Sequence, residues 1–432
     1  MTTAADQLPQ PLLRTASFRW LMGGALVSAL GDQFTLIALP WLVLVTTGDA
    51  ATMGLVIALA SVPRALFMLL GGAVVDRYSP RTVQLLSKYA NVVLLSLLAV
   101  LVMFNLATLP VIGALALALG LASAFGIPSA TSMLPHVVAP AQLASANGIM
   151  MGVRQLTMLA GPLLAALIFV VGGDGSAAGP HSGAAGLAWA FGLDALSFAV
   201  SAWTLRQVTM LPAPPKPPGA PAGMFAAVVE GLATLWRDRP LRALMLYWAL
   251  CAVVVGGTLQ VALPVLASTR LHGASALGLV MAANGAGTLI GMGLSGTLGK
   301  LRVGSLGSTV LLIDGLLGVL MIPMGMVQFT WQAVALMLAA GMLAGVMQVA
   351  VFSWIQQRVA RAMLGRAMSI FMFIFMGLAP IAAALTGLLM NHVGLTALFA
   401  GAGCVLICAA ALAYLTTTIR VIDDVRPADL LP

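Results

Sequence analysis

The chain has 432 residues, of which 61% are hydrophobic and 7% are charged. An ordinary soluble domain carries about 25% charged residues, so this composition excludes a soluble fold. The formal net charge is +8, but the basic residues are scattered between apolar runs instead of forming a basic face, which argues against a nucleic-acid partner.

The apolar residues form runs of about 20, the length that a helix needs to cross a membrane. These runs lack period-2 alternation, so helices are favoured over a β-barrel. No small-residue cleavage site precedes the first run, and we expect its helix to be retained. The sequence thus predicts an all-α membrane protein with twelve transmembrane helices, at residues 19–46, 52–75, 82–104, 109–133, 143–171, 186–206, 241–267, 275–298, 305–327, 331–353, 366–390 and 395–418.

The distribution of Lys and Arg predicts the orientation of these helices. When alternate loops are assigned to the two sides, Arg270 falls on one side, and Arg64 and Arg154 fall within spans. The other 17 of the 20 basic residues fall on the opposite side: Arg14, Arg19, Arg77, Arg81, Lys88, Arg206, Lys216, Arg237, Arg239, Arg242, Lys300, Arg302, Arg358, Arg361, Arg366, Arg420 and Arg426. Because short cytoplasmic loops hold the basic excess, we expect both termini in the cytoplasm and the chain in a bacterial inner membrane.

A long connection and an internal repeat divide the predicted helices into halves. The connection begins with a Pro-rich stretch at 211–221 and continues with an amphipathic pattern at 224–239. At an offset of 224 residues, Ala-Leu-Pro at 38–40 recurs at 262–264, and Gly-Leu-Val at 54–56 recurs at 278–280. We therefore expect two pseudo-symmetric six-helix halves at 1–206 and 241–420, a linker at 207–240 and a cytoplasmic tail at 421–432.

The connection after the second span carries a family signature. The stretch from Gly72 through Asp76 and Arg77 to Arg81 resembles the loop signature of the major facilitator superfamily, with Ser79 and Pro80 in place of its later Gly and the following Arg. The resemblance implies the major facilitator fold and transport by alternating access. It also implies that Gly72, Asp76, Arg77 and Arg81 belong to a cytoplasmic gate, with Asp76 as its acidic residue.

Other stretches resemble bacterial exporters of the macrolide-efflux and enterobactin-exporter type. They are Gly31-Asp32, Ser145 to Gly148, Gly161-Pro162 and Asp194 to Phe198. The pair Gly161-Pro162 also resembles the fifth-helix motif of drug:proton antiporters, although Ala165 and Ala166 stand where that motif has paired glycines. Export as the direction of transport rests on this resemblance.

Charges inside the spans are the strongest functional candidates, because a charge in a membrane is costly and usually functional. Asp32 in the first span is the candidate for proton coupling, and the alternative is a fixed ion pair with Arg64 in the second. Arg154 in the fifth span is a candidate for binding an anionic group of the substrate or for pairing with Asp32. Asp194 and Asp314 lie in the sixth and ninth spans, which are peripheral in the resembled superfamily, and we expect packing or hydrogen-bonding roles for them.

Uncharged polar and aromatic side chains supply the remaining cavity candidates. For each of them plain helix packing is the competing interpretation. They are Gln33, Gln260, Asn284, Gln348, Phe371 and Phe375.

The sequence predicts a transporter and not an enzyme. It contains no nucleotide-binding Gly-Lys-Ser/Thr motif, nucleophile-base arrangement or metal-type cysteine spacing, so we expect no cofactor and no metal, and an ion gradient as the energy source. The leading hypothesis is a secondary active transporter that exports a hydrophobic or amphiphilic molecule, such as a drug or siderophore-like metabolite, in exchange for protons. We expect it to act as a monomer among membrane lipids. An importer, a lysolipid flippase, a channel and a non-transport membrane scaffold remain open.

Overall fold

The computed structural model describes residues 11–172, 184–211, 236, 238–271, 273–298, 304–358 and 377–422. These residues form helices and no strand. Eleven of the described helical segments are long and apolar enough to cross a membrane, and the helix Gly377–Met390 is apolar but shorter. The predicted all-helical membrane fold is therefore confirmed.

The helices follow the predicted spans closely. The long helices are α1 (Ala16–Thr47), α2 (Ala50–Tyr78), α3 (Pro80–Met103), α4 (Leu109–Ala124), α6 (Leu143–Gly172), α7 (Ala184–Arg206), α11 (Ala274–Leu298), α12 (Leu306–Met324), α13 (Thr330–Arg358) and α15 (Leu395–Thr416). The seventh span consists of α9 (Arg239–Cys251), a π-helical turn at Ala252–Gly256 and α10 (Gly257–Thr269).

One predicted span is interrupted. The fourth span breaks at Phe125 between α4 and the short α5 (Gly126–Met133). Pro128 stands in the first turn of α5 and has no N–H to donate to the carbonyl of Ala124, so the α-helical ladder is interrupted at that point. The 3-10 turn Leu134–His136 then extends the segment.

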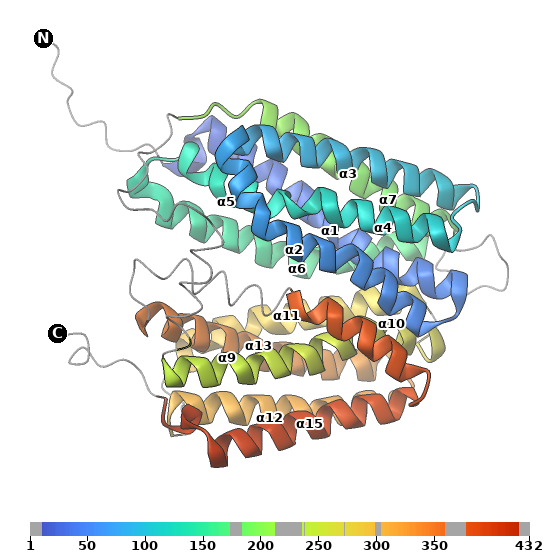
Figure 1. Ribbon diagram of the computed structural model, residues 1–432, viewed down its shortest axis with the longest axis vertical. Coiled ribbons are helices and arrows are strands. Elements are labelled where there is room, and N and C mark those ends of the chain that lie inside the picture. The colour runs from blue at the N-terminus through green and yellow to red at the C-terminus, as the bar shows by residue number, and fades with distance from the viewer. Residues whose placement is uncertain are drawn as a thin grey trace, which may run out of the picture.

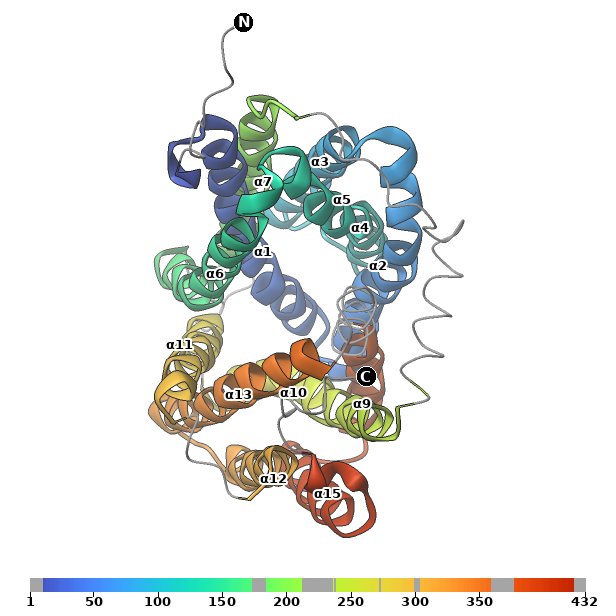
Figure 2. The same ribbon diagram turned by 90° about the vertical axis from the view of Figure 1, so that its left-hand side faces the viewer.

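The helices lie side by side in two groups (Figure 1). Helices α1 to α7 form the upper group, and α9 to α15 form the lower one. The end-on view shows α1, α3 and α7 together in the first group, and α12 beside α15 in the second (Figure 2). The described part of the chain both begins and ends on the left in Figure 1, here called the end that holds the termini, whereas the connection between α1 and α2 is on the right.

The two groups touch at the end away from the termini, where helix backbones cross closely. A Cβ added at Gly54 in α2 would lie 2.6 Å from the carbonyl oxygen of Ala383, and one added at Gly387 would lie 2.7 Å from that of Ala50. Since real Cβ atoms essentially never come this close, glycine is required at both positions for this crossing.

Helices α6 and α11 make the second junction between the groups. A Cβ at Gly278 in α11 would lie 2.8 Å from the Pro162 oxygen, and one at Gly285 would lie 2.6 Å from the Met158 oxygen. Further along, Gln155 Nε2 donates to the sulfur of Met292 at 2.7 Å. This junction therefore runs from the end away from the termini toward the middle of the molecule.

Asp49 caps α2 beside the first of these junctions. Its carboxylate accepts hydrogen bonds from the Thr52 hydroxyl at 2.5 Å and from the amides of Thr52 and Ala51 at 2.9 and 3.2 Å. The Thr52 hydroxyl and amide are the main causes that lower the pKa of Asp49 from its ordinary value of 3.8, with a smaller contribution from Asn391. Asp49 therefore stabilises the start of α2 and faces the second group through Asn391.

The two predicted features of the linker fall almost entirely outside the described residues. The Pro-rich stretch at 211–221 is described only at Leu211. The amphipathic pattern at 224–239 is described only at Trp236, Asp238 and Arg239.

Candidate functional site

Three of the charged residues that the sequence places inside the spans are exposed. Asp32 lies in the middle of α1, Arg64 in α2 and Arg154 in α6. Since these helices are otherwise apolar, exposure of charges at such depth indicates a polar face within the membrane region.

Asp32 and Arg64 are neighbours without direct contact. The carboxylate of Asp32 interacts electrostatically with Arg64 and with Lys88. The Arg64 guanidinium donates to Ser61 Oγ at 3.3 Å, and within the described residues no ion pair of 4.0 Å or less joins it to Asp32. The two charges thus attract each other without touching. A fixed ion pair, which is the alternative role for these residues, would require direct contact.

Arg154 stands on a side of α6 that also contacts α1. Gly161 is two turns further along α6 on the same side, and a Cβ there would collide with the side chain of Gln33 in α1. Met158, one turn further along, places its carbonyl oxygen against Gly285 in α11. Because Arg154 shares its side of α6 with both contacts, it lies between α1 and α11. Among the described residues no ion pair joins it to an acid.

Lys88 requires a correction. The distribution of Lys and Arg predicts that it lies on the cytoplasmic side, but it lies within α3, where it is 7% exposed. Its ammonium donates to Ser201 Oγ in α7 at 2.6 Å and to Ser28 Oγ in α1 at 3.5 Å, and it lies 5.6 Å from the centre of the Phe198 ring. Lys88 is therefore an intramembrane charge near Asp32.

A sequence signal for Lys88 exists. Gln84, Ser87, Lys88 and Asn91 recur at helical spacing, and all four are buried. Such a stripe of polar residues at the start of an apolar span predicts an interior face of the helix bundle, not a loop.

Asp194 in α7 is 1% exposed and faces α1. It accepts hydrogen bonds from the Thr35 hydroxyl at 2.5 Å and from the Ser197 hydroxyl at 3.1 Å, and it interacts electrostatically with Asp32. The hydrogen bonds fit the expected hydrogen-bonding role. The interaction with Asp32 is a further feature, which the sequence alone does not predict.

The residues of the loop signature lie at the end that holds the termini. Gly72, Asp76 and Arg77 fall in the last turns of α2, and Arg77 is exposed. Ser79 takes a positive φ of 76° at a position where the resembled signature has Gly, so the turn geometry is kept at the cost of backbone strain. Arg81 donates to the carbonyl oxygen of Arg206 at 2.7 Å, and so ties the start of α3 to the end of α7.

The remaining candidates are spread over several helices. Gln33 packs against Gly161 of the fifth-helix motif, and Pro162 is buried against Gly278. Gln260 and Asn284 are partly buried, with Asn284 Nδ2 donating to the Met337 oxygen at 3.5 Å, and Gln348 is exposed. Phe371 and Phe375 lie outside the described residues.

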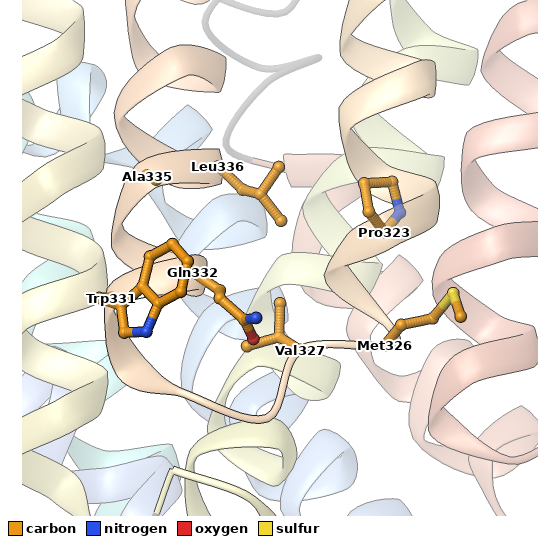
Figure 3. A pocket seen from close by; sticks show the side chains of 7 residues that line it. All are labelled: Pro323, Met326, Val327, Trp331, Gln332, Ala335 and Leu336. Carbon is orange, nitrogen blue, oxygen red and sulfur yellow. The ribbon is translucent and has the colours of Figure 1, made fainter.

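A pocket of about 370 Å³ between α12 and α13 contains none of the predicted site residues. Figure 3 shows its lining, which is Pro323, Met326, Val327, Trp331, Gln332, Ala335 and Leu336. The Gln332 oxygen already accepts from the amides of Gln328 and Phe329. The polar side chain of this pocket is therefore engaged locally, and the charged face on α1, α2 and α6 is the better candidate site.

Comparisons with known proteins identify the family of the chain. The family model described as Major Facilitator Superfamily matches residues 21–384. A protein of Mycobacterium tuberculosis named multidrug efflux pump Tap is 28% identical over 237 residues, which are 52% of this chain and 52% of that protein. The chain thus matches about half the length of this relative. The enterobactin exporter EntS of Salmonella typhimurium is 25% identical over 358 residues, which are 82% of this chain and 81% of EntS.

Two solved structures share the fold at low sequence identity. A bacterial homologue of the iron transporter ferroportin, in its inward-facing state, has a TM-score of 0.71 at 18% identity, covering 95% of this chain and 99% of that one. The nucleoside transporter NupG has a TM-score of 0.70 at 14% identity, covering 93% of this chain and 100% of NupG.

Proposed function

This chain belongs to the Major Facilitator Superfamily and is a multi-pass membrane transporter, and we propose that it exports a hydrophobic or amphiphilic small molecule in exchange for protons. The substrate would be a drug or a siderophore-like metabolite, and the proton gradient would supply the energy. The efflux function of the relatives Tap and EntS supports export as the direction.

The observation that carries this proposal is the exposed charged face within the membrane region. Asp32 is the acid of this face, and its neighbours Arg64 and Lys88 are cations. Apolar surroundings favour the protonated form of a carboxyl group and neighbouring cations favour the ionised form, so a carboxyl group under both influences is suited to bind and release a proton near neutral pH. Asp32 is therefore the proposed proton-coupling residue.

Arg154 is the proposed contact for an anionic group of the substrate. It lies exposed between α1 and α11, without an acid partner among the described residues. A guanidinium binds carboxylate and phenolate oxygens by charge-assisted hydrogen bonds. The apolar helices around it would hold the hydrophobic part of an amphiphile.

Alternating access requires the two groups of helices to rock against each other. We assign residues 1–206 and 241–420 to the moving halves, 207–240 to their linker and 421–432 to a cytoplasmic tail. If both termini lie in the cytoplasm, as the Lys and Arg distribution indicates, the closed junction at Gly54 and Gly387 is on the outer side. The conformation is then inward-facing, and Gly72, Asp76, Arg77 and Arg81 belong to the open cytoplasmic gate.

The test is dye and drug efflux from energised cells that express the protein. A panel of cationic, anionic and neutral compounds is loaded, and efflux is followed with and without a protonophore. We expect the wild type to export at least one compound and to lose this export with the protonophore. Asp32→Asn should abolish the protonophore-sensitive part, because an amide cannot exchange a proton.

Asp314→Asn is the matched control. Asp314 is also a carboxyl group within a span, but it is buried, with 3% exposed in α12, and its amide variant should export as the wild type does. Export that persists in Asp32→Asn and with the protonophore would rule out proton coupling and favour facilitated transport. Uptake instead of export would support an importer, and movement of lysolipid would support a flippase. If no compound moves, a scaffold would be supported.

A further inference from the structure

Two buried charges lie next to Asp32, and the proposed function uses Lys88 only as a neighbouring cation and Asp194 not at all. Lys88 in α3 is 7% exposed and Asp194 in α7 is 1% exposed. Each is held by hydroxyl groups, Lys88 by Ser201 and Ser28, and Asp194 by Thr35 and Ser197. Among the described residues no ion pair of 4.0 Å or less joins either one to an opposite charge.

The positions of these contacts place Asp32 between the two charges. Ser28, Asp32 and Thr35 are spaced by four and three residues along α1, so they share one side of the helix. At 1.5 Å per residue, the Lys88 contact at Ser28 lies about 6 Å before Asp32, and the Asp194 contact at Thr35 lies about 4.5 Å beyond it. Asp32 interacts electrostatically with both Lys88 and Asp194.

Gly31 explains how Asp194 comes so near to α1. A Cβ on Gly31 would collide with the Asp194 carboxylate and the Ser197 hydroxyl. Gly31 therefore allows the carboxyl group of Asp194 to approach α1 closely, and the next residue, Asp32, carries the second carboxyl group.

The other helices against α1 add only two charges near this place. Among the described helices that pack on α1, α2 supplies Arg64 and α6 supplies Arg154, whereas α4, α10 and α11 carry no charged residue. Arg64 is in electrostatic reach of Asp32, and Arg154 is not among its interacting charges. The charges that act on Asp32 are thus Lys88, Asp194 and Arg64.

We propose that Lys88 and Asp194 are positioning residues of the proton-coupling site, and that with Asp32 they form one unit of two carboxyl groups and one ammonium that holds a single exchangeable proton. With the proton bound, the unit is neutral. When the proton leaves to water at the exposed side of Asp32, the unit carries one negative charge, which Arg64 faces. This proposal rests on the proposed function.

A purely structural role is the competing explanation, because buried charges also occur as fixed parts of a fold. The two explanations differ in the pH dependence of transport. Lys88→Met removes a positive charge near Asp32, so the ionised carboxylate is less stabilised and the pH of half-maximal efflux should rise. Asp194→Asn removes a repelling negative charge, so this pH should fall. For a unit charge a few ångströms away, each shift should be about one pH unit or more.

The experiment measures proton-driven dye transport by purified protein in proteoliposomes between pH 5 and 9. Lys88→Arg keeps the charge and should show the wild-type midpoint. The double variant Lys88→Met/Asp194→Asn should also return close to it, because the opposite shifts offset each other. Thermal unfolding in detergent and gel filtration check that each variant is folded.

Shifts in the same direction, or unchanged midpoints in folded variants, would overturn the proposal and leave Asp32 as the sole coupling residue. A wild type without gradient-driven transport would instead overturn the proposed function itself, so the two failures are distinguishable.

A second measurement needs no variant. Dicyclohexylcarbodiimide modifies protonated carboxyl groups in apolar surroundings, and mass spectrometry locates the adduct. At acidic pH each wild-type molecule should be modified once, at Asp32 or at Asp194. At alkaline pH neither residue should be modified. Modification of both residues in the same molecule would contradict a single shared proton.

Discussion

Arg154 illustrates how the environment of a residue sets its role in this transporter. It lies exposed between α1 and α11, and among the described residues it has no acid partner. A charge at membrane depth is costly, and a bound anion offsets part of that cost. Arg154 should therefore determine whether the transporter prefers anionic substrates.

Arg154→Gln should weaken transport of anionic compounds selectively. A charge-assisted hydrogen bond contributes about 1.5–3 kcal/mol, which corresponds to roughly a tenfold to a hundredfold change in apparent affinity. The half-saturating concentration of a carboxylate-bearing dye should rise by that factor, whereas that of a neutral dye should hardly change. Arg154→Lys should lose only part of the effect.

Arg270→Gln is the control for this measurement. Arg270 donates to the Gly325 oxygen at 2.6 Å and to Thr396 at 3.0 Å within the second group, away from the proposed site. An equal loss for neutral and anionic dyes in Arg154→Gln, or the same loss in Arg270→Gln, would contradict a role for Arg154 in binding the substrate anion.

The charged residues differ in how far the sequence predicts them. Asp32, Arg64 and Arg154 are conspicuous because they interrupt long apolar runs near their middle. Lys88 stands near the start of its span, where loop and interior are difficult to tell apart. The polar stripe to which it belongs favours the interior, and its burial and its hydrogen bonds to α1 and α7 show that it lies there. The nearness of Asp194 to Asp32 depends on helix packing, which spacing within one helix does not reveal.

At the scale of the helices, run length and hydropathy predict position well. The structure begins and ends most spans within a few residues of the prediction. The break at Phe125 and the π-helical turn at Ala252–Gly256 were not predicted, because apolar runs continue through both. The close crossing at Gly54 and Gly387 was not predicted either, since Gly is abundant in this chain, with 46 residues, and many of the described glycines approach helices of their own group instead.

Gly54→Leu should prevent closure of the junction away from the termini. The added side chain meets the backbone of Ala383, which cannot move aside as a flexible side chain can. Spin labels at Leu55 and Leu388, both exposed, would report the distance between the groups in a variant without the native cysteines. The wild type should show a short-distance population that Gly54→Leu lacks, and export should fall with it.

Gly23→Leu serves as the control, because no atom lies within 4 Å of a Cβ at Gly23. It should keep the wild-type distance distribution. If Gly54→Leu also keeps the short-distance population, the glycine crossing does not determine closure.

For the molecule as a whole, the contacts between the two groups of helices and the side that holds the basic residues together indicate which way the transporter is open. Arg81 bonds to Arg206 within the first group, and Arg358 pairs with Asp238 at 2.9 Å within the second. Both contacts are at the end that holds the termini, and neither joins the two groups. Among the described residues the groups meet at the opposite end, through Gly54, Gly387 and the α6 and α11 junction, which is the arrangement expected of an inward-facing transporter if both termini lie in the cytoplasm.

In the proposed mechanism, substrate leaves in exchange for a proton carried by Asp32. The most direct test encloses a pH-sensitive dye in proteoliposomes that contain purified protein and imposes a gradient of a transported compound without any ion gradient. We predict that movement of the compound drives protons the opposite way and changes the internal pH in the wild type, and that Asp32→Asn causes no pH change. Transport of the compound by the wild type at constant internal pH, or an equal pH change in Asp32→Asn, would contradict proton exchange through Asp32.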